Sequence, residues 1–396
     1  MLPLTLVLAS MTVGESPRFT VHTTELKPTT GQILKLDADG TLTLKDPAAL
    51  VPAGNLVSLR RLDRPLPAFA RNPMIILANG DRIRGVVLGG DTKVIKFQPA
   101  WSKDAPWEVS LSTLAAIWGR PQPADMPTDP SAYPWADSPK RRDVLWLRNG
   151  DIARGTIEGF TVDPLGVRIK TADPLPTTHR LDNVTALAFD PSLARVRKPK
   201  TAYYRLTLTD GSRIGLATAI SEGTSLSGTT LFGPKLQVPL TEVVSLDVHQ
   251  GKAIYLSDLK PKKAEVQPYQ SMSWPWAADR SIRGNPITLG ADTFEKGLGT
   301  HSRTTLTYDL AGKYRRFESL VGLDPLTGRR GAVDLRILID GKEQPLPDLL
   351  GLTLGKSPQA ITIDLKAAKE LTLIVDYGPT GDVQDDVNWA DARLIE

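Results

Sequence analysis

The stretch "FEKGLGTHSRTTLTYDL", Phe294 to Leu310, decides the fold of the C-terminal third of the chain. Gly297 and Gly299 come just before a histidine, and apolar and polar residues then alternate. Glycine tolerates sharp backbone bends, and alternation with period two is typical of a strand with one face on a core. The pattern predicts a turn that leads into a strand and places His301 near the start of that strand.

Further segments downstream show the same alternation. They are "AVDLRILID" (332–340), "AITIDL" (360–365) and "ELTLIVDYG" (370–378). Asp340-Gly341 between two of these runs is a hairpin-turn signal. Several such strands at short spacing predict an antiparallel β-sandwich.

The motifs of this region also follow a known order. "KGLGTHS" (296–302), "FESLVGLD" (317–324), "ILIDGK" (337–342) and "DDVNWADA" (385–392) occur one after another. In this order the segment from about residue 254 to the end closely resembles the NPCBM family of carbohydrate-binding modules. The resemblance implies a galactose-binding-like jelly-roll sandwich over residues 252–396, with a glycan, of galactose type, as its ligand.

Within that resemblance, a small group of residues has the chemistry of a shallow lectin site. An aromatic face can cover the C–H groups of a sugar, and convergent polar groups can bind its hydroxyls. The candidates for carbohydrate binding are His301, Arg303, Asp386, Asn388 and Trp389. Other roles stay open, because a Trp flanked by small residues also suits a core, and a His after Gly-x-Gly can simply cap the turn.

Two features near these candidates leave further questions open. Trp274 and Trp276, with Asp279 and Arg280, either cover an end of the sandwich or contact the ligand. Many family members carry His where this chain has Asp386, which weakens the transfer of the family's site. The adjacent carboxylates of Asp385 and Asp386, with Asp382 close by, either bind a structural Ca²⁺ or face solvent.

The first 250 residues contain an internal repeat. Tight-turn dipeptides begin at Asn79, Asn149 and Asp210 between apolar runs. Similar closing segments follow: "LSTLAAI" (111–117), "LDNVTAL" (181–187) and "LTEVVSL" (240–246), with "LVSLRRL" (56–62) before them. Repetition of this kind indicates one small fold used several times. We predict four β units at 17–66, 67–122, 140–192 and 200–250, which resemble SH3-like or Sm-like barrels in pattern only.

The composition restricts where the protein can function and which classes of partner it can bind. The chain has 396 residues, a net charge of +4 and no cysteine, so disulfides and thiolate metal sites are excluded. The positive charge is spread thinly, which argues against nucleic acid as a partner. Residues 1–16 have the apolar run of a signal peptide but no basic start, and no other run is long enough to span a membrane. We therefore expect an extracytoplasmic protein, periplasmic or secreted.

No catalytic constellation is visible in the sequence, and we identify no catalytic residue. The chain is predicted to be a non-catalytic, exported carbohydrate-binding protein that binds sugar through its C-terminal sandwich. One alternative is a structural or adhesion protein whose sandwich has lost its sugar. A third is a glycosidase-associated protein, although a glycosidase needs two carboxylates facing each other across a cleft. The N-terminal units offer a surface for a protein partner.

Overall fold

The computed structural model describes residues 16–25, 27–134, 142–195, 199–268, 273–379 and 381–396. Strands dominate this part of the chain, and the all-β class predicted from sequence is confirmed. Its helices are three-residue 3₁₀ turns: η1 (Leu111–Thr113), η2 (Pro130–Ala132), η3 (Leu181–Asn183), η4 (Pro191–Leu193), η5 (Leu240–Glu242), η6 (Leu256–Asp258) and η7 (Pro347–Leu349). Among these residues no helix is long and apolar enough to cross a membrane. The predicted signal segment lies outside the described residues, apart from Ser16.

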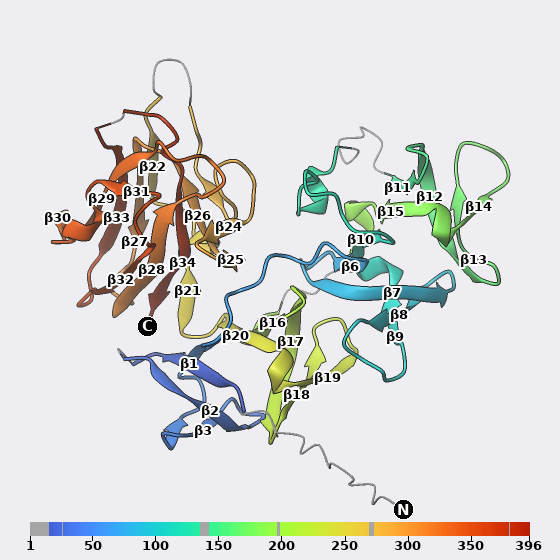
Figure 1. Cartoon of the computed structure of the whole chain (residues 1–396), viewed down its shortest axis with the longest axis horizontal. Coiled ribbons are helices and arrows are strands. Elements are labelled where there is room, and N and C mark those ends of the chain that lie inside the picture. The colour runs from blue at the N-terminus through green and yellow to red at the C-terminus, as the bar shows by residue number, and fades with distance from the viewer. Residues whose placement is uncertain (1–15, 26, 135–141, 196–198, 269–272, 380) are drawn as a thin grey trace, which may run out of the picture.

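Four groups of five strands, here called units 1 to 4, make up the N-terminal part (Figure 1). Unit 1 contains β1 (Arg18–Thr23), β2 (Thr29–Leu36), β3 (Leu42–Lys45), β4 (Ala49–Val51) and β5 (Leu56–Arg61). Unit 2 contains β6 (Met74–Leu77), β7 (Arg82–Gly90), β8 (Val94–Pro99), β9 (Trp107–Ser110) and β10 (Leu114–Trp118). Unit 3 contains β11 (Asp143–Leu147), β12 (Ile152–Val162), β13 (Leu165–Lys170), β14 (Thr177–Arg180) and β15 (Val184–Ala188). Unit 4 contains β16 (Tyr203–Leu208), β17 (Arg213–Glu222), β18 (Ser225–Thr230), β19 (Lys235–Pro239) and β20 (Val243–His249).

The tight turns detected in the sequence open units 2, 3 and 4. Gly80, Gly150 and Gly211 adopt φ of 89°, 91° and 84°, a left-handed conformation that favours glycine. Each glycine joins two antiparallel strands, which are β6–β7, β11–β12 and β16–β17. The Asn-Gly and Asp-Gly signals therefore mark the hairpins that start these units.

The closing strands join the units in two nested pairs. Strand β5 runs antiparallel to β20, with Leu59 opposite Leu246, so units 1 and 4 form an outer pair. Strand β10 runs antiparallel to β15, with Ile117 opposite Leu187, so units 2 and 3 form an inner pair. These registers make Leu59 equivalent to Ile117. The sequence comparison matched segment 56–62 to segment 111–117, so the true equivalence differs from it by three residues. The reason is that Leu56 already starts the strand and no 3₁₀ turn precedes it.

The C-terminal part is a sandwich of two sheets. One sheet has the order β23 (Ala277–Ala278), β26 (Gly297–Thr300), β34 (Val387–Ile395), β28 (Arg316–Leu323), β32 (Gln359–Asp364), and β21 (Ala253–Tyr255) also pairs with β34. The other has the order β22 (Lys263–Val266), β27 (Thr304–Asp309), β33 (Glu370–Tyr377), β29 (Ala332–Ile339), β30 (Lys342–Glu343), and β31 (Leu352–Thr353) pairs with β29. Strands β24 (Ile287–Leu289) and β25 (Asp292–Phe294) form a separate hairpin. The alternating stretch that opened the sequence analysis thus spans a turn and two strands of this sandwich.

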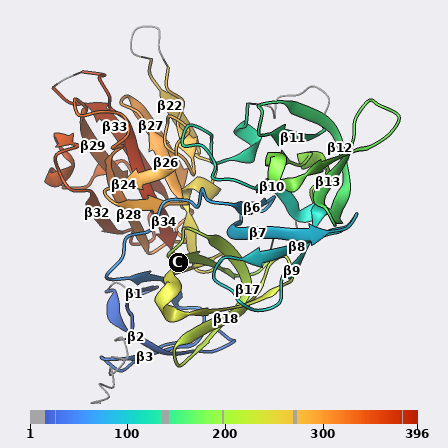
Figure 2. The ribbon, with the colours of Figure 1, turned by 45° about the vertical axis from the view of Figure 1, so that its right-hand side comes forward.

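The sandwich contacts the outer pair through strands β34 and β28 (Figures 1 and 2). Asp391 of β34 accepts a hydrogen bond from Arg60 Nη2 of β5 at 2.9 Å. Arg316 of β28 donates to the backbone carbonyls of Thr24 and Thr23 at 3.1 and 2.9 Å. The two parts of the chain are therefore joined by specific charged contacts as well as by the peptide that connects them.

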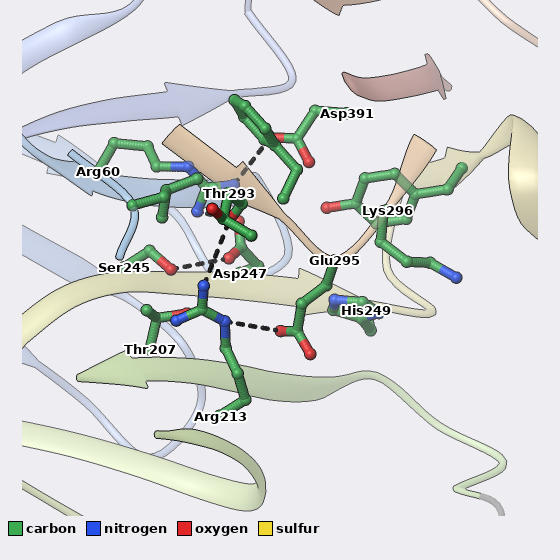
Figure 3. A pocket seen from close by; sticks show the side chains of 13 residues that line it. Arg60, Thr207, Arg213, Ser245, Asp247, His249, Thr293, Glu295, Lys296 and Asp391 are labelled. Carbon is green, nitrogen blue, oxygen red and sulfur yellow. Dashed lines mark hydrogen bonds and ion pairs between the residues drawn. The ribbon is translucent and has the colours of Figure 1, made fainter. Parts of the chain in front are cut away.

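Glu295, from the opening stretch, is the centre of a buried ionic cluster between the two parts. Its carboxylate accepts from Arg205 Nη2 at 2.6 Å and lies 3.6 Å from Arg213 Nε, as Figure 3 shows for Arg213. Burial alone would raise the pKa of Glu295, but the guanidinium of Arg205, with that of Arg213, lowers it to about 2. Removing one partner of such a cluster leaves an uncompensated buried charge, which is strongly destabilising.

Candidate functional site

Trp389 lies in the core of the sandwich. Its side chain is 0% exposed and packs in the same cluster as Leu298 and Phe317. Its indole Nε1 donates to Thr300 Oγ1 at 3.1 Å, so its polar atom is satisfied internally. Strand β34 is flanked by β26 and β28, which explains why this residue has no free face. Contrary to the expectation from sequence, Trp389 cannot offer an aromatic platform to a ligand.

His301 is also buried, with only 2% of its surface exposed. Its Nδ1 lies 3.2 Å from Ser302 Oγ, which in turn donates to Asp382 at 2.6 Å. Its Nε2 lies 3.4 Å from Asp386 Oδ1. Burial lowers the pKa of His301, although the carboxylates of Asp386 and Asp382 oppose that shift. His301 therefore links two loops beneath the surface and does not reach a ligand directly.

The aromatic surface at this end of the sandwich comes from Trp274, which is half-buried. Its ring stacks on His301 with the centroids 5.8 Å apart and an interplanar angle of 28°. The guanidinium of Arg283 lies 3.9 Å from the Trp274 ring centroid, close enough for a cation–π interaction. The other tryptophan of this loop, Trp276, packs against the sandwich core.

Asp386 holds this arrangement together. Its Oδ2 accepts from Arg283 Nε at 2.7 Å and from Thr327 Oγ1 at 3.0 Å, and its side chain is 1% exposed. The residue that departs from the family's His therefore fixes Arg283 over Trp274. It positions other groups and does not itself face a ligand.

Three buried carboxyl or amide oxygens in this part of the sandwich lack a hydrogen bond of normal geometry, although a side-chain hydroxyl lies beside two of the three residues: Ser281 beside Asp324 and Ser302 beside Asp385. They belong to Asn388 (Oδ1), Asp324 (Oδ2) and Asp385 (Oδ2), whose side chains are 1%, 1% and 0% exposed. Burial raises the pKa of Asp324 and raises that of Asp385 to about 7. Because an unpaired buried polar atom is costly, Asn388 Oδ1, the one of the three without a neighbouring hydroxyl, would gain most from a hydroxyl donor that can reach it below the surface.

A hollow of about 220 Å³ opens on the same face of the sheet as Asn388, although none of the three oxygen-bearing residues lines it. Asn388 stands opposite Gly322 in the β34–β28 pair, so the two residues point to the same face of the sheet. Gly322 lines the hollow together with Gly290, Leu323, Pro325, Leu354, Gly355, Lys356, Ser357 and Pro358. The candidate site is the end of the sandwich that carries Asn388, Asp386 and the Trp274–Arg283 pair, with the hollow on the same sheet face as Asn388.

Arg303 belongs to a different group. It has a φ of 66°, hydrogen-bonds Gln267, and lies 5.6 Å from the ring centroid of Tyr377 and 3.7 Å from Asp376. These residues lie at one end of the β22–β27–β33 part of the second sheet, and none of them belongs to the candidate site. Of the five predicted residues, the structure thus brings together His301, Asp386 and Asn388, places Trp389 beneath them, and separates Arg303.

The sequence reasoning missed several members of the site. Asp324 ends the "VGLD" motif and could have been nominated from that motif, whereas Arg283 and Thr327 lie in loops without a clear pattern. In the described part of the chain, no group of three or more His, Asp or Glu side chains is arranged to hold a metal ion. A structural Ca²⁺ at Asp382, Asp385 and Asp386 stays a prediction that no observation here supports.

The fold and the site define a β-sandwich binding module. Residues 252–395 match the NPCBM/NEW2 domain, and this segment of the chain is therefore an NPCBM domain. The chain is 28% identical over 167 residues to "Putative endo-alpha-N-acetylgalactosaminidase" of Renibacterium salmoninarum. That match covers 41% of this chain and 11% of the relative, so the chain spans about a tenth of that protein.

Two solved structures from Clostridium perfringens are also similar. CBM51 of GH95, in complex with methyl-galactose, has 25% identity and a TM-score of 0.31, covering 36% of this chain and 99% of that chain. CBM51-2 of ZmpB, in complex with GlcNAc and with INT domains, has 24% identity and a TM-score of 0.33, covering 48% and 43%.

Proposed function

We propose that this chain is a non-catalytic, extracytoplasmic protein that binds a saccharide at the candidate site of its NPCBM domain. The observation that carries the proposal is the buried, unpaired Oδ1 of Asn388 on the strand that follows Asp386, the residue that holds Arg283 over the half-buried ring of Trp274. A sugar hydroxyl can donate to such an oxygen, and the solvent-exposed part of the Trp274 indole, whose ring also contacts His301 and Arg283, adds apolar surface for C–H groups. Arg283 adds donors at the edge of the site.

The affinity is expected to be low. Each net hydrogen bond contributes only about 0.5–1.5 kcal/mol, and part of that gain is lost in ordering the ligand. A site with one aromatic surface and two or three hydrogen bonds should therefore bind with a Kd of about 0.1–1 mM, or roughly −4 to −5.5 kcal/mol. Weak binding of this kind needs a multivalent assay.

A glycan array probed with the full chain tests the proposal, with galactosides and N-acetylglucosamine as first probes. Trp274→Ala should remove most of the binding, and Asn388→Leu should reduce it about tenfold, the ~1.4 kcal/mol of one lost contact. Trp101→Ala, a half-buried tryptophan of unit 2, is the matched control and should bind like the parent. The bound glycans should remain uncleaved. Equal binding by Trp274→Ala and the parent would refute the assignment of the site.

A structural or adhesion role is the second candidate. The observation that favours it is the burial of both Trp389 and His301, because direct sugar binding by these residues requires them at the surface. In that case the array would show no binding with any glycan, and the domain would act through its contacts with the N-terminal units and a protein partner.

A further inference from the structure

A cleft of about 420 Å³ separates the NPCBM domain from the outer pair. Its volume lies within the range of small-molecule sites, and such sites occur preferentially at domain interfaces. The cleft is distinct from the candidate site, since the two share no lining residue. Both parts of the chain line it: His22, Pro28, Ser58, Arg60, Arg61, Arg64, Leu66 and Val244 from the N-terminal part, and Asp292, Phe294, Glu318, Ser319, Leu320, Ala360, Ile361, Thr362, Asp391 and Arg393 from the domain.

One wall of the cleft is apolar. Leu66, Val244 and Phe294 belong to a single buried cluster, and Leu320 packs against it while remaining partly exposed. A wall of this kind can cover the C–H face of a ring-shaped ligand, which gains from the removal of apolar surface from water.

The rest of the lining is largely polar and carries charges of both signs. Arg60 is paired with Asp391 at 2.9 Å, and Arg393 is paired with Glu318 at 2.9 Å. Arg60 also contacts Asp247, Arg393 also donates to Ser58 Oγ at 3.4 Å, and Glu318 also accepts from Arg316 at 2.7 Å. What remains for a ligand is the carboxylate lone pairs and guanidinium N–H groups that these contacts leave unused. Charged groups of both signs thus stand side by side along this part of the lining.

Three further groups, His22, Arg64 and Thr362, add hydrogen-bonding capacity to the cleft. Burial lowers the pKa of His22 to about 4, with the positive charges of Arg393 and Arg60 acting in the same direction. The ring of His22 is therefore neutral at pH 7, and one nitrogen donates while the other accepts. Arg64 and Thr362 are both exposed and line the cleft, so they are accessible from solvent.

This combination selects the ligand by its chemistry. An anion would meet the carboxylates of Asp292, Glu318 and Asp391, and a cation would meet four guanidinium groups. A neutral compound whose hydroxyls both donate and accept can use both kinds of group, and an apolar face would suit the apolar wall. We propose that the cleft is a second saccharide-binding site, built jointly by the NPCBM domain and the outer pair.

This inference rests on the proposed function for the class of ligand, but it assigns a separate place on the molecule. It also gives the N-terminal units a role in recognition. Because the ionic contacts around Glu295 and Asp391 hold the two parts together, both walls of the cleft keep a fixed separation. A preorganised site of this kind loses less free energy on binding than one that must assemble.

The absence of cysteine from the chain allows a site-specific test with the full-length protein. Thr362→Cys places a single thiol in the cleft, and Leu326→Cys places one beside the candidate site, next to Thr327. Leu175→Cys, in unit 3 and 79% exposed, serves as the control. The rate of alkylation by iodoacetamide is measured without ligand and with galactose, N-acetylglucosamine, glucuronate or inorganic phosphate.

We expect one of the two neutral sugars to slow alkylation in Thr362→Cys about tenfold at ten times its Kd, with no change in Leu175→Cys. Adding Leu320→Trp to fill the cleft should abolish that protection, whereas Leu350→Trp, at an exposed leucine of the same domain, should not. If Leu320→Trp fails to fold, the protection in Thr362→Cys alone decides the question.

The remaining outcomes separate the two proposals. Protection in Leu326→Cys without protection in Thr362→Cys would overturn the cleft site and leave the proposed function standing. Protection in Thr362→Cys alone would support the cleft and overturn the candidate site. Protection of the cleft thiol only by glucuronate or phosphate would show an anion site and contradict the neutral saccharide, and protection of neither thiol by any sugar would overturn both proposals.

Discussion

The outer and inner pairs of units present equivalent faces with opposite chemistry. The residue that follows the central apolar residue of each closing strand is Arg60 or Asp247 in the outer pair. At the same positions the inner pair has Trp118 and Ala188. The same backbone arrangement thus carries charges in one pair and apolar side chains in the other.

The partners of the two faces differ accordingly. The outer face contacts the NPCBM domain through ion pairs, as between Arg60 and Asp391. The inner face is covered by the chain's own segment 120–134, whose Tyr133 packs edge-on against Trp118 at 5.7 Å and accepts a hydrogen bond from its Nε1 at 2.9 Å. A polar face suits a partner that must be positioned specifically, whereas an apolar face is simply buried by the nearest available segment.

One feature is common to both faces. Arg82 in unit 2 and Arg213 in unit 4 occupy the first position after equivalent hairpin turns, and they pair with each other across β7 and β17. Arg82 donates to Gln122 Oε1 of the covering segment at 2.9 Å, and Arg213 donates to the Thr293 carbonyl of the domain at 3.2 Å. Arg82 therefore anchors segment 120–134 to the inner pair, and Arg213 anchors the NPCBM domain to the outer pair.

The largest effect is expected at the inner face. Trp118→Ala removes a side chain that is 1% exposed, and truncation of a buried tryptophan costs about 3–5 kcal/mol. Thermal unfolding monitored by circular dichroism should show this loss. Trp274→Ala is the matched control and should cost much less, because its ring is only half-buried. Similar losses in the two variants would contradict the description of the inner face as a packed core.

A smaller loss is expected at the outer face. Glu295→Gln keeps the shape of the side chain but removes the charge that pairs with Arg205 and Arg213. Hydrogen bonds to charged groups contribute about 1.5–3 kcal/mol, so calorimetry should show a destabilisation of that size and an earlier, separate transition of the NPCBM domain. The exposed Glu222→Gln of unit 4 is the control. A single unshifted transition in Glu295→Gln would mean that the ionic cluster does not hold the two parts together.

The last effect concerns pH and the buried carboxyl of Asp385, whose Oδ1 accepts from the Ala332 N–H at 3.1 Å. Its pKa is raised by burial from 3.8 to about 7, so between these values the folded state keeps a proton that the unfolded state has lost. The stabilisation from this group is full below pH 3.8 and is lost as the pH rises through 7. Asp385→Asn should therefore gain stability relative to the parent between pH 5 and 8, by about 2–4 °C in Tm for each ~1 kcal/mol.

The difference between variant and parent isolates this carboxyl from the histidines. Burial lowers the pKa values of His22 and His301, which makes their contributions fall as the pH is lowered, in the opposite sense to Asp385. Asp364→Asn, at an exposed aspartate of β32, provides a control curve. Parallel curves for Asp385→Asn and the parent over this pH range would contradict the raised pKa.

Period-two alternation and turn residues are enough to predict many of the strands and hairpins. The runs at 332–340 and 370–378 become β29 and β33, and the Asn-Gly and Asp-Gly turns become hairpins. The nesting of the units could not be read from the chain, because the pairing of β5 with β20 joins residues almost 200 positions apart and depends on tertiary packing. Local patterns define strands, but they do not choose between distant partners.

The site was less predictable for a physical reason. The exposure of a tryptophan depends on which strands flank it, and "NWADA" reads the same whether Trp389 is in the core or at the surface. His301 and Asp386 are both buried, and they contact Trp274 and Arg283, which come from another loop. Sequence can nominate residues of the right chemistry, but only the fold shows which of them meet a ligand.

The central claim is that the NPCBM domain binds a sugar at the Trp274–Asn388 end of the sandwich. A crystal structure of the full chain with the best glycan from the array tests this most directly. The sugar ring should lie within van der Waals contact of Trp274, with a hydroxyl about 2.7–3.2 Å from Asn388 Oδ1. Clear density for the sugar elsewhere, with this oxygen still unpaired and Trp274 uncovered, would contradict the claim.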